Sequence, residues 1–442
     1  MNGIEDTSCA FAPSCFFDED FFLQEPLDLY RRGYLHPVAI SDIIRPDPSP
    51  SASRSQDAPS GYRILHKLGK GGEATVWLAQ EVDRLDRAVA LKIFSADCFS
   101  AAEREAGALK ALKASENGVG SENVLCLLDE FTFTGPNGVH KVHITEVVVP
   151  LWKLSSLLPA VAKKKVATDL ARGLAHVHHC GFIHGDIHFG NVGCAMPSGF
   201  TMDRIVDTMA RLYEYDVTMV VPIKPAYRTR SLPPYLVSPC EILRVYKHHG
   251  GYNADQHAKL LDFGNARRIG EEDTDVTGCV CPPPEAVFAY HGCDGLEMPP
   301  TPEGDIWCLG AVMFALFTDE GITYDRTSAL LLQQAKLHGV IPPAWQTHWD
   351  KTQFLHTNSA EVTLENAEAE WTRRRDNFIQ ENPEVDAAEA DLLISLLRQM
   401  LATDPDDRPS AAEVLAHRWF TEDGAMPVIP AQDRNGRSLQ DP

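Results

Sequence analysis

The sequence has no apolar run long enough to cross a bilayer. Its longest apolar stretches, around Ile144–Leu158 and Ile306–Phe317, are interrupted by charged residues such as Glu146 and Lys153 or are too short, because a spanning helix needs roughly 20 apolar residues. The N-terminal region carries acids at Asp18–Asp20 instead of the basic segment of a secretory signal. We therefore expect no membrane partner and an intracellular location, in the cytoplasm, the nucleus or both.

Regularly spaced cysteines and an excess of positive charge are also missing. The 11 cysteines include no CxxC pair, so neither a zinc site nor a disulfide framework is favoured over reduced core and surface thiols. The formal net charge of −22 argues against a nucleic-acid backbone as a partner. We expect no direct nucleic-acid binding and a monomer, and the acidity is compatible with a basic polypeptide partner.

The length of 442 residues and the 44% hydrophobic content predict a large core divided between two lobes. A Pro- and Ser-rich segment at Arg45–Ser60 reads as a flexible linker that precedes an ordered domain. We expect the following organisation: an N-terminal extension at 1–61, with a distinct lead-in at about 25–44 and the linker at about 45–60, a first lobe at 62–149, a second lobe at 150–420 and a flexible tail at 421–442.

The first lobe reads as strands followed by one helix, and the second lobe is mostly helical. The predicted elements are strands at Tyr62–Leu68, Thr75–Gln80 and Ala88–Phe94, a helix at Ala101–Leu112, and a buried amphipathic helix through Val166, Leu170, Leu174 and Val177 that stops at Gly181. The stretch from about 195 to 256 fits neither a clean helix nor a series of strands. We interpret it as an insertion within the second lobe.

A glycine-rich turn lies between the first two predicted strands. It reads Leu68-Gly69-Lys70-Gly71-Gly72-Glu73-Ala74-Thr75-Val76. Its glycines would let the backbone approach phosphate groups, Ala74 takes a third small position, and Val76 could pack on a nucleotide base. Taken alone, this pattern fits a simple hairpin turn better.

A lysine on the third strand is the candidate cation for nucleotide phosphates. Lys92 has apolar neighbours on both sides in Ala88–Ile93, which would bury its stem and present one ammonium group to the α- and β-phosphates. A strand lysine is usually only solvated. Glu105 on the following helix is at a plausible distance to pair with Lys92, and Glu103 is the alternative. We prefer Glu105 because small and apolar residues follow it.

Two further motifs carry the groups that phosphoryl transfer to a hydroxyl requires, which are a carboxylate facing the hydroxyl and ligands for a metal ion. The first is His184-Gly185-Asp186-Ile187-His188-Phe189-Gly190-Asn191, and the second is Asp262-Phe263-Gly264. Asp186 would orient and deprotonate the acceptor hydroxyl. Asn191 and Asp262 would bind Mg²⁺, with Asp262 as the principal ligand, so ATP and Mg²⁺ are the predicted cofactors.

Three downstream residues support the same assignment by their order along the chain. Glu285 ends Pro283-Pro284-Glu285, and Asp305 begins an apolar helical stretch and would hold the backbone of the His184–Asn191 loop. Arg408, in Asp404–Pro409, is the expected buried partner of Glu285. An arginine before a proline is normally a surface residue, and only the order of the whole set overrides that expectation.

From about Tyr62 to Phe420 the chain resembles the eukaryotic protein kinases. The resemblance implies an α+β fold with two lobes, a β-rich N-lobe with one regulatory helix and a mainly α-helical C-lobe. It implies an enzyme that transfers the γ-phosphoryl group of ATP to Ser or Thr hydroxyls of a protein. The nucleotide site that it implies also includes Ala90 and the hinge residues Glu146 and Val148.

Within that family the chain looks most like the SR-protein kinases, particularly divergent fungal-type members. The segment Glu25–Val38 resembles their "Tyr…Gly-Gly-Tyr-His-Pro-Val" lead-in, Thr75–Ala79 resembles Ser-Thr-Val-Trp-Leu, and Asp262–Ala266 resembles Asp-Leu-Gly-Asn-Ala. The insertion precedes Asp262, where that family places its spacer. The resemblance implies a protein substrate with basic arginine- and serine-rich segments, which suits an acidic enzyme.

Two positions in the catalytic loop depart from the usual kinase pattern. Gly185 stands where most protein kinases have an arginine that grips an activation-loop phosphate. With only Thr274 and Thr277 as phosphorylatable residues between Asp262 and Glu285, we predict activity that is independent of phosphorylation there. His188 replaces a lysine, and histidine is mostly neutral at pH 7 because its ordinary pKa is about 6.5. It either supplies weak charge stabilisation, with slower turnover, or hydrogen-bonds Asp186 and orients it.

Two other functions share parts of this pattern. The His-Gly-Asp-x-His-x-x-Asn loop also resembles small-molecule phosphotransferases such as the aminoglycoside and choline kinases, which generally lack counterparts of Glu285, Asp305 and Arg408. A catalytically weak, pseudokinase-like scaffold would be attractive if a residue among Lys92, Asp186, Asn191 and Asp262 were missing. All four are present.

Overall fold

The computed structural model describes residues 11–13, 24–48, 58–115, 119–197, 215–222, 229–248, 256–271, 279–292, 298–318 and 328–421. Contacts divide the chain into two compact units. Unit 1 comprises Met1–Ala106, Cys126–Val148 and Met196–Gly251, and unit 2 comprises Gly107–Leu125, Val149–Ala195 and Tyr252–Pro442. Among the described residues, no helix has both the length and the hydropathy needed to cross a membrane.

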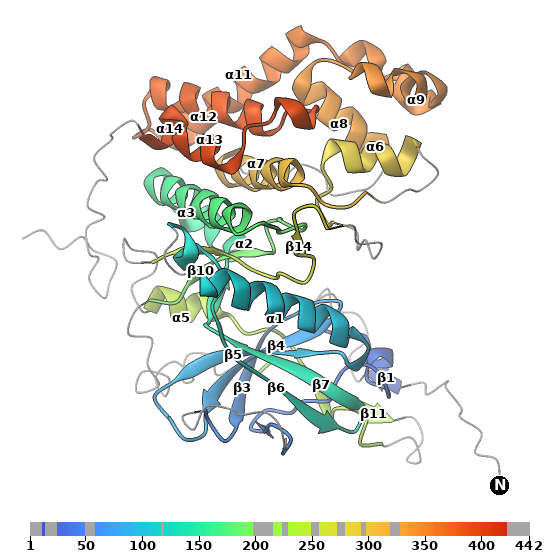
Figure 1. The fold of residues 1–442 in the computed structure, drawn as a ribbon, viewed down its shortest axis with the longest axis vertical. Helices are drawn as coiled ribbons and strands as arrows, with labels where there is room; N and C mark the ends of the chain where they lie inside the picture. The colour runs from blue at the N-terminus through green and yellow to red at the C-terminus, as the bar shows by residue number, and fades with distance from the viewer. Residues whose placement is uncertain are drawn as a thin grey trace, which may run out of the picture. The chain divides into compact units, whose positions relative to one another are not determined.

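Unit 1 is built on a six-stranded antiparallel sheet with the strand order β2-β3-β4-β5-β7-β6 (Figure 1). Its strands are β2 (Ile43–Ile44), β3 (Tyr62–Lys70), β4 (Ala74–Glu81), β5 (Ala88–Phe94), β6 (Leu127–Gly135) and β7 (Gly138–Thr145). The three strands expected from the sequence are confirmed, and β3 and β4 are each two residues longer than predicted. The expected helix is also present, as α1 (Phe99–Ala114).

The sheet owes its stability to one apolar face. Trp77 on β4, Leu91 on β5 and Ile144 on β7 belong to one buried cluster, and alternate strand residues are expected to share a face. Val38 and Ile44 from the lead-in join the same cluster. The lead-in therefore forms part of the core of unit 1, and β2 within it extends the sheet by pairing with β3.

The stretch from about 195 to 256 contains regular structure that its sequence pattern did not reveal. It holds β11 (Val217–Pro222), β12 (Tyr235–Val237) and α5 (Ile242–His248). The strand β11 lies between β12 and β1 (Phe11–Pro13) in a second antiparallel sheet. Part of this stretch also packs with the lead-in, since Leu236 shares a buried cluster with Tyr30 and Leu35. These residues group with unit 1, whereas the sequence pattern predicts an insertion within the second lobe.

Unit 2 is mainly α-helical. Its longer helices are α3 (Ala160–His179), α6 (Pro284–Gly292), α7 (Pro302–Thr318), α8 (Ser328–His338), α11 (Leu364–Glu381) and α12 (Ala387–Met400). Shorter helices are α2 (Leu151–Leu154), α9 (Gln346–Lys351), α10 (Gln353–Thr357), α13 (Ala411–Ala416) and α14 (Arg418–Thr421). Figure 1 shows α3 beside α7, and α7 also packs against α12.

Short strands that lie almost entirely in unit 2 carry the loops that matter for function. β10 (Val192–Ala195) lies between β13 (Ala258–Leu260) and β8 (Val148–Pro150), while β9 (Phe182–Ile183) pairs with β14 (Arg267–Arg268). The antiparallel ladder of β10 and β13 places Val192 opposite Leu260. This register brings together the residue before β10 and the residues after β13.

The buried helix α3 leads into the first of these loops. Val166, Leu170, Leu174 and Val177 are all buried, as their helical spacing predicted. The helix ends at His179, and Gly181 follows with a φ of 78°, which favours glycine over residues with a Cβ atom. The β-rich unit 1 and the mainly helical unit 2 confirm the predicted α+β fold with two lobes.

Candidate active site

Unit 1 holds Lys92 and Glu105 in direct contact. The Lys92 Nζ atom lies 2.8 Å from Glu105 Oε2, and the glutamate side chain is only 2% exposed. Lys92 is in the middle of β5, where its ammonium group also lies 4.9 Å from the centre of the Phe94 ring. The predicted ion pair is therefore present, and it presents one lysine ammonium group with a fixed counter-charge.

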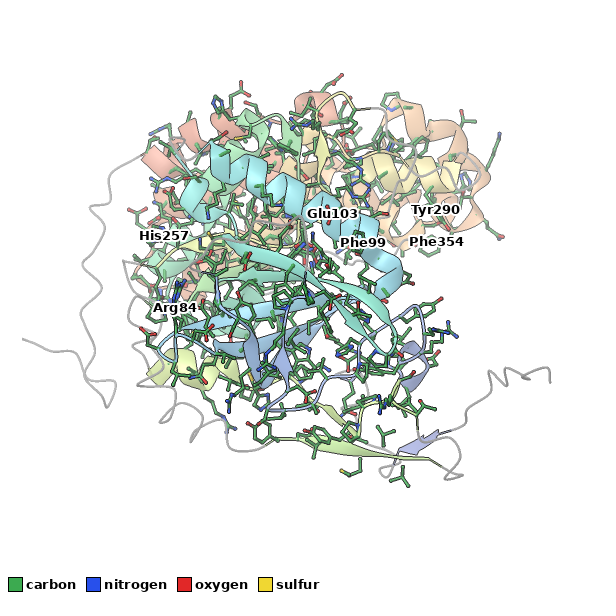
Figure 2. The ribbon with its side chains drawn as sticks, turned by 60° about the horizontal axis from the view of Figure 1, so that its bottom comes forward. Arg84, Phe99, Glu103, His257, Tyr290 and Phe354 are labelled. Atoms are coloured by element: carbon green, nitrogen blue, oxygen red, sulfur yellow. The ribbon has the colours of Figure 1, made fainter. Side chains whose placement is uncertain are left out.

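Glu103, the alternative partner, points to a different lysine. It pairs with Lys141 on β7, and its side chain is 52% exposed. Figure 2 shows Glu103 on α1 near Phe99, at the beginning of the helix. Helical residues two positions apart do not share a face, so only one of the two glutamates can reach Lys92. The preference for Glu105 is confirmed by this geometry.

The glycine-rich turn connects β3 and β4 in the same unit. β3 ends at Lys70, β4 begins at Ala74, and the Gly71 N–H donates to the Ala74 carbonyl at 2.8 Å. An added Cβ at Gly69 or Gly72 would meet nothing within 4 Å. The backbone here is open to approach, as phosphate binding requires, although an open turn also fits an ordinary hairpin.

The other residues of the predicted nucleotide site also have defined places in unit 1. Ala90 is buried on β5, and the Thr75 hydroxyl accepts a hydrogen bond from the Trp77 indole at 2.9 Å. The Thr75 side chain is therefore part of the buried core. Glu146 Oε1 accepts the Cys126 N–H at 2.9 Å, and Val148 is half-buried. Their roles in nucleotide binding stay predictions.

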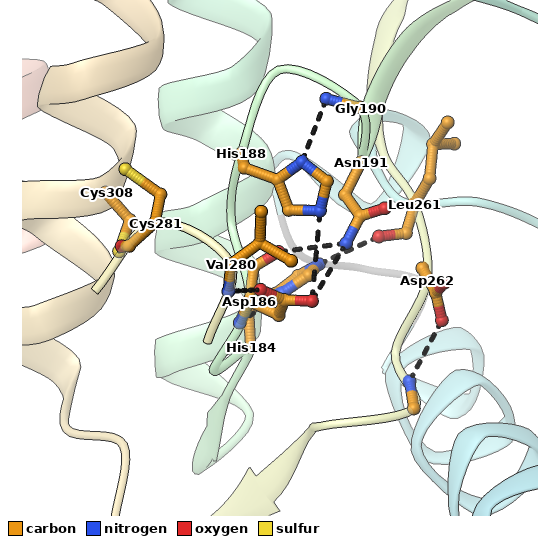
Figure 3. Close-up of polar contacts among 11 residues, drawn as sticks. His184, Asp186, His188, Gly190, Asn191, Leu261, Asp262, Val280, Cys281 and Cys308 are labelled. Carbon is orange, nitrogen blue, oxygen red and sulfur yellow. Dashed lines mark hydrogen bonds and ion pairs between the residues drawn. The ribbon is translucent and has the colours of Figure 1, made fainter. Parts of the chain in front are cut away.

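The catalytic loop of unit 2 gathers polar groups around Asp186 (Figure 3). The Asn191 amide donates to the Asp186 carbonyl at 3.0 Å and lies 3.4 Å from its Oδ2. Asp186 Oδ1 accepts the backbone N–H of Val280 at 2.8 Å. The carboxylate is thus oriented by two segments that are distant in the sequence.

Asp262 reaches the same region through the sheet register. Asn191 precedes β10 and Asp262 follows β13, and the Leu261 N–H donates to the Asn191 carbonyl at 2.8 Å. Asp262 has a φ of 60°, which is unusual for a residue other than glycine, and such strain is commonly found at functional sites. Figure 3 shows the side chains of Asn191 and Asp262 in the same loop region.

Asp305 holds the backbone of the catalytic loop. Its Oδ2 accepts the His184 N–H at 2.7 Å, and its Oδ1 accepts the Gly185 N–H at 2.9 Å. His178 Nε2 lies 3.0 Å from Oδ2. Asp305 is 2% exposed, so these bonds are sheltered from water. The structure confirms the predicted role of Asp305 in fixing this loop.

Gly185 has both a backbone and a packing reason to be glycine. Its φ is 79°, in the left-handed region. A Cβ atom at this position would lie 2.9 Å from the Asn265 carbonyl oxygen and 3.2 Å from Pro300 Cβ. A side chain at this position would therefore crowd its neighbours and strain the backbone. Thr274 and Thr277, on which the prediction about phosphorylation also depends, lie outside the described residues.

His188 is held as a neutral ring. The Gly190 N–H donates to His188 Nδ1 at 3.0 Å, so Nε2 carries the proton and faces Asp186 Oδ2 at 3.8 Å. Burial lowers the pKa of His188 below its ordinary value, with Asp186 acting in the opposite direction. The distance of 3.8 Å is too long for a hydrogen bond. His188 therefore lies beside Asp186 without the charge that a lysine would bring.

The predicted pair of Glu285 and Arg408 is present, and Arg408 is its buried member. Arg408 donates to both carboxylate oxygens of Glu285, at 2.9 and 2.6 Å, and the Arg408 side chain is fully buried. It also donates to three backbone carbonyls, those of Ala402, Glu303 and Thr403. This bidentate geometry ties the start of α6 to the segment that precedes α13.

Two neighbours of the candidate site were not found from the sequence. Val280 bonds Asp186 through its backbone, which leaves no signal in residue identity. His143 lies opposite Lys92 in the β5–β7 ladder, with Nδ1 3.9 Å from Glu105 Oε2. The register of two strands that are about 50 positions apart decides this contact, so only the folded sheet reveals it.

Comparisons with known proteins indicate the class of enzyme that the chain resembles. Residues 251–420 match the family described as protein kinase domain. A serine/threonine protein kinase of Aspergillus fumigatus is 26% identical over 90% of each chain. The serine/threonine-protein kinase SRPK of Physarum polycephalum is 26% identical over 89% of this chain and 90% of its own. The human SRSF protein kinase 3 is 31% identical over 38% of this chain and 29% of its own.

The two-lobed fold, the arrangement around Asp186 and these matches define the chain as a serine/threonine protein kinase that acts on proteins. ATP and a divalent metal ion are typical cofactors of that class. Among serine/threonine kinases, the chain is similar to those of the SRPK type.

Proposed function

We propose that the enzyme transfers the γ-phosphoryl group of ATP to Ser or Thr hydroxyls through the residues described above. Lys92, held by Glu105, supplies a cation for the α- and β-phosphates, and the open backbone of the glycine-rich turn supplies N–H donors. Asp186 orients the acceptor hydroxyl and accepts its proton. The observation that carries this proposal is the convergence of Asn191 and Val280 on the Asp186 carboxylate.

We further propose Mg²⁺ as the metal ion, with Asn191 and Asp262 as its ligands. Carboxylate and amide oxygens suit this hard cation, which usually retains water and phosphate oxygens as its remaining ligands. The β10–β13 register supports the pairing, because it places these two residues at the same end of a short ladder. When bound, the ion would neutralise phosphate charge in the transition state.

The proposed substrate class is basic protein with arginine- and serine-rich segments. The net charge of −22 favours such a partner, and one relative is named SRSF protein kinase 3. Electrostatic attraction of this kind raises the association rate and weakens as salt increases. We therefore expect the apparent KM for a basic peptide to rise with ionic strength.

A peptide-kinase assay tests the substrate class. The full chain should phosphorylate an Arg-Ser repeat peptide in preference to an acidic casein-type peptide, while an Asp186→Asn variant should phosphorylate neither. Phosphorylation of the acidic peptide alone would refute the substrate assignment. If the wild-type enzyme phosphorylates neither peptide, the assignment of basic arginine- and serine-rich substrates is also refuted.

We also propose that activity does not require phosphorylation between Asp262 and Glu285. Gly185 supports this, because it has no side chain with which to bind a phosphate. A Thr274→Ala, Thr277→Ala double variant should keep its activity. A large loss of kcat in that variant would contradict the proposal.

A further inference from the structure

A buried ion pair lies at the base of the glycine-rich turn. Lys67 is near the end of β3 and is 1% exposed, and its ammonium group pairs with Glu25, which is 3% exposed. The same ammonium group lies 5.6 Å from the centre of the Trp77 ring. Burial lowers the pKa of Lys67, and the nearby Glu25 opposes that shift. Two charges are seldom buried together unless each is the other's partner.

The glutamate of this pair belongs to the lead-in, far from Lys67 in the sequence. Its neighbour Gln24 makes a second contact with β3, because Lys70 Nζ donates to the Gln24 carbonyl at 2.5 Å. Lys67 and Lys70 flank Leu68 and Gly69, the first two residues of the turn motif. The lead-in thus holds this short stretch of β3 at both ends.

The segment after β12 contributes a third contact. The Cys240 N–H donates to the Lys67 carbonyl at 2.8 Å, and the Gln24 amide donates to Ser238 Oγ at 3.1 Å. The same amide lies 2.9 Å from Thr218 Oγ1 on β11. Two segments outside the glycine-rich hairpin therefore converge on the residues that precede its turn.

External contacts matter at this point because the β3–β4 ladder is irregular there. Lys67 is opposite Trp77 and Gly69 is opposite Val76, so the register shifts between them. A bulge of this kind interrupts the ladder and leaves local backbone less constrained. Glycine increases that freedom further. The ion pair and the Cys240 bond compensate by fixing Lys67 itself.

We propose that Glu25 and Lys67 are positioning residues for nucleotide binding, which act by holding the end of β3 so that the glycine-rich turn is already ordered when phosphates bind. This inference rests on the proposed nucleotide-binding role of that turn. Ordering the backbone of one residue is worth roughly a factor of ten in affinity. Loss of the ion pair should therefore raise the KM for ATP about tenfold.

Steady-state kinetics of a Glu25→Gln variant tests the proposal. We expect its KM for ATP to rise about tenfold, with the KM for the peptide substrate within twofold of wild type. The matched control is Glu81→Gln, because Glu81 is also a buried carboxylate of unit 1 that pairs with arginine, but it lies at the other end of the β3–β4 hairpin, opposite Tyr62. That variant should lose thermal stability while its KM for ATP stays within twofold of wild type.

A second variant guards against misfolding of the first. The double variant Glu25→Leu, Lys67→Met removes both charges, and buried ion pairs replaced by apolar residues often keep their stability. It should fold and retain a raised KM for ATP, because apolar contacts lack the directional hold of the ion pair. A wild-type KM for ATP in the double variant, or equal changes in Glu25→Gln and Glu81→Gln, would overturn the inference. Absence of kinase activity in the wild-type chain would overturn the proposed function and this inference with it.

Discussion

Asp305 offers the sharpest test of how the fold serves catalysis. Its two oxygens accept the His184 and Gly185 backbone N–H groups at 2.7 and 2.9 Å, and its Oδ2 also faces His178 Nε2 at 3.0 Å. In Asp305→Asn the new amide nitrogen cannot accept a hydrogen bond. The fewest hydrogen bonds are lost if this nitrogen takes the position of Oδ1, because both contacts of Oδ2 are then preserved. The Gly185 N–H would then be buried without an acceptor.

The size of the effect follows from this one lost bond. A hydrogen bond to a charged group contributes about 1.5–3 kcal/mol. If the loss appears fully in the transition state, kcat should fall roughly 10- to 150-fold. The KM for ATP should change little, because Asp305 acts on the loop that carries Asp186 and not on the glycine-rich turn.

Steady-state kinetics and thermal denaturation, measured side by side, check this reasoning. Asp386→Asn is a suitable control, because Asp386 accepts a backbone N–H at the start of α12 and serves as a helix cap. The control should lose a little stability and keep its kcat. If Asp305→Asn keeps a kcat within twofold of wild type despite lower stability, the proposed link between Asp305 and the position of Asp186 is refuted.

Three further outcomes are expected. Glu105→Gln should lower kcat/KM for ATP about tenfold or more, because it removes the counter-charge of a buried ion pair, whereas Glu103→Gln should stay within about twofold of wild type. Gly185→Ala should lower the free energy of unfolding by about 1–3 kcal/mol in urea denaturation, since its Cβ would press on the Asn265 carbonyl in a left-handed backbone conformation. His188→Gln should change kcat less than about threefold and leave the pH profile unaltered above its ordinary pKa of about 6.5, because burial lowers that pKa and keeps the ring neutral there. A marked loss of rate at pH 7.5 would contradict this expectation.

Much of the architecture could be predicted because its signals are local. The strands around the glycine-rich turn show short β-prone runs, and α3 shows apolar residues at helical spacing that end near Gly181. The short strands β11 and β12 carried too little local signal. β11 pairs with β1, which is distant in the sequence, and with β12, which follows β11 after an intervening segment. Pairing of that kind is decided by tertiary contacts.

The sequence by itself determined which chemical groups this kinase possesses, since Lys92, Asp186, Asn191 and Asp262 are recognisable from the order of their motifs. Tertiary structure decided how those groups are held. The choice of Glu105 over Glu103 depends on which face of α1 meets β5, and the contact of Val280 with Asp186 involves only backbone. The pairing of Glu25 with Lys67 joins residues that only the folded core brings together. Local patterns encode residue types and periodicity, whereas these contacts depend on the packing of segments far apart in the chain.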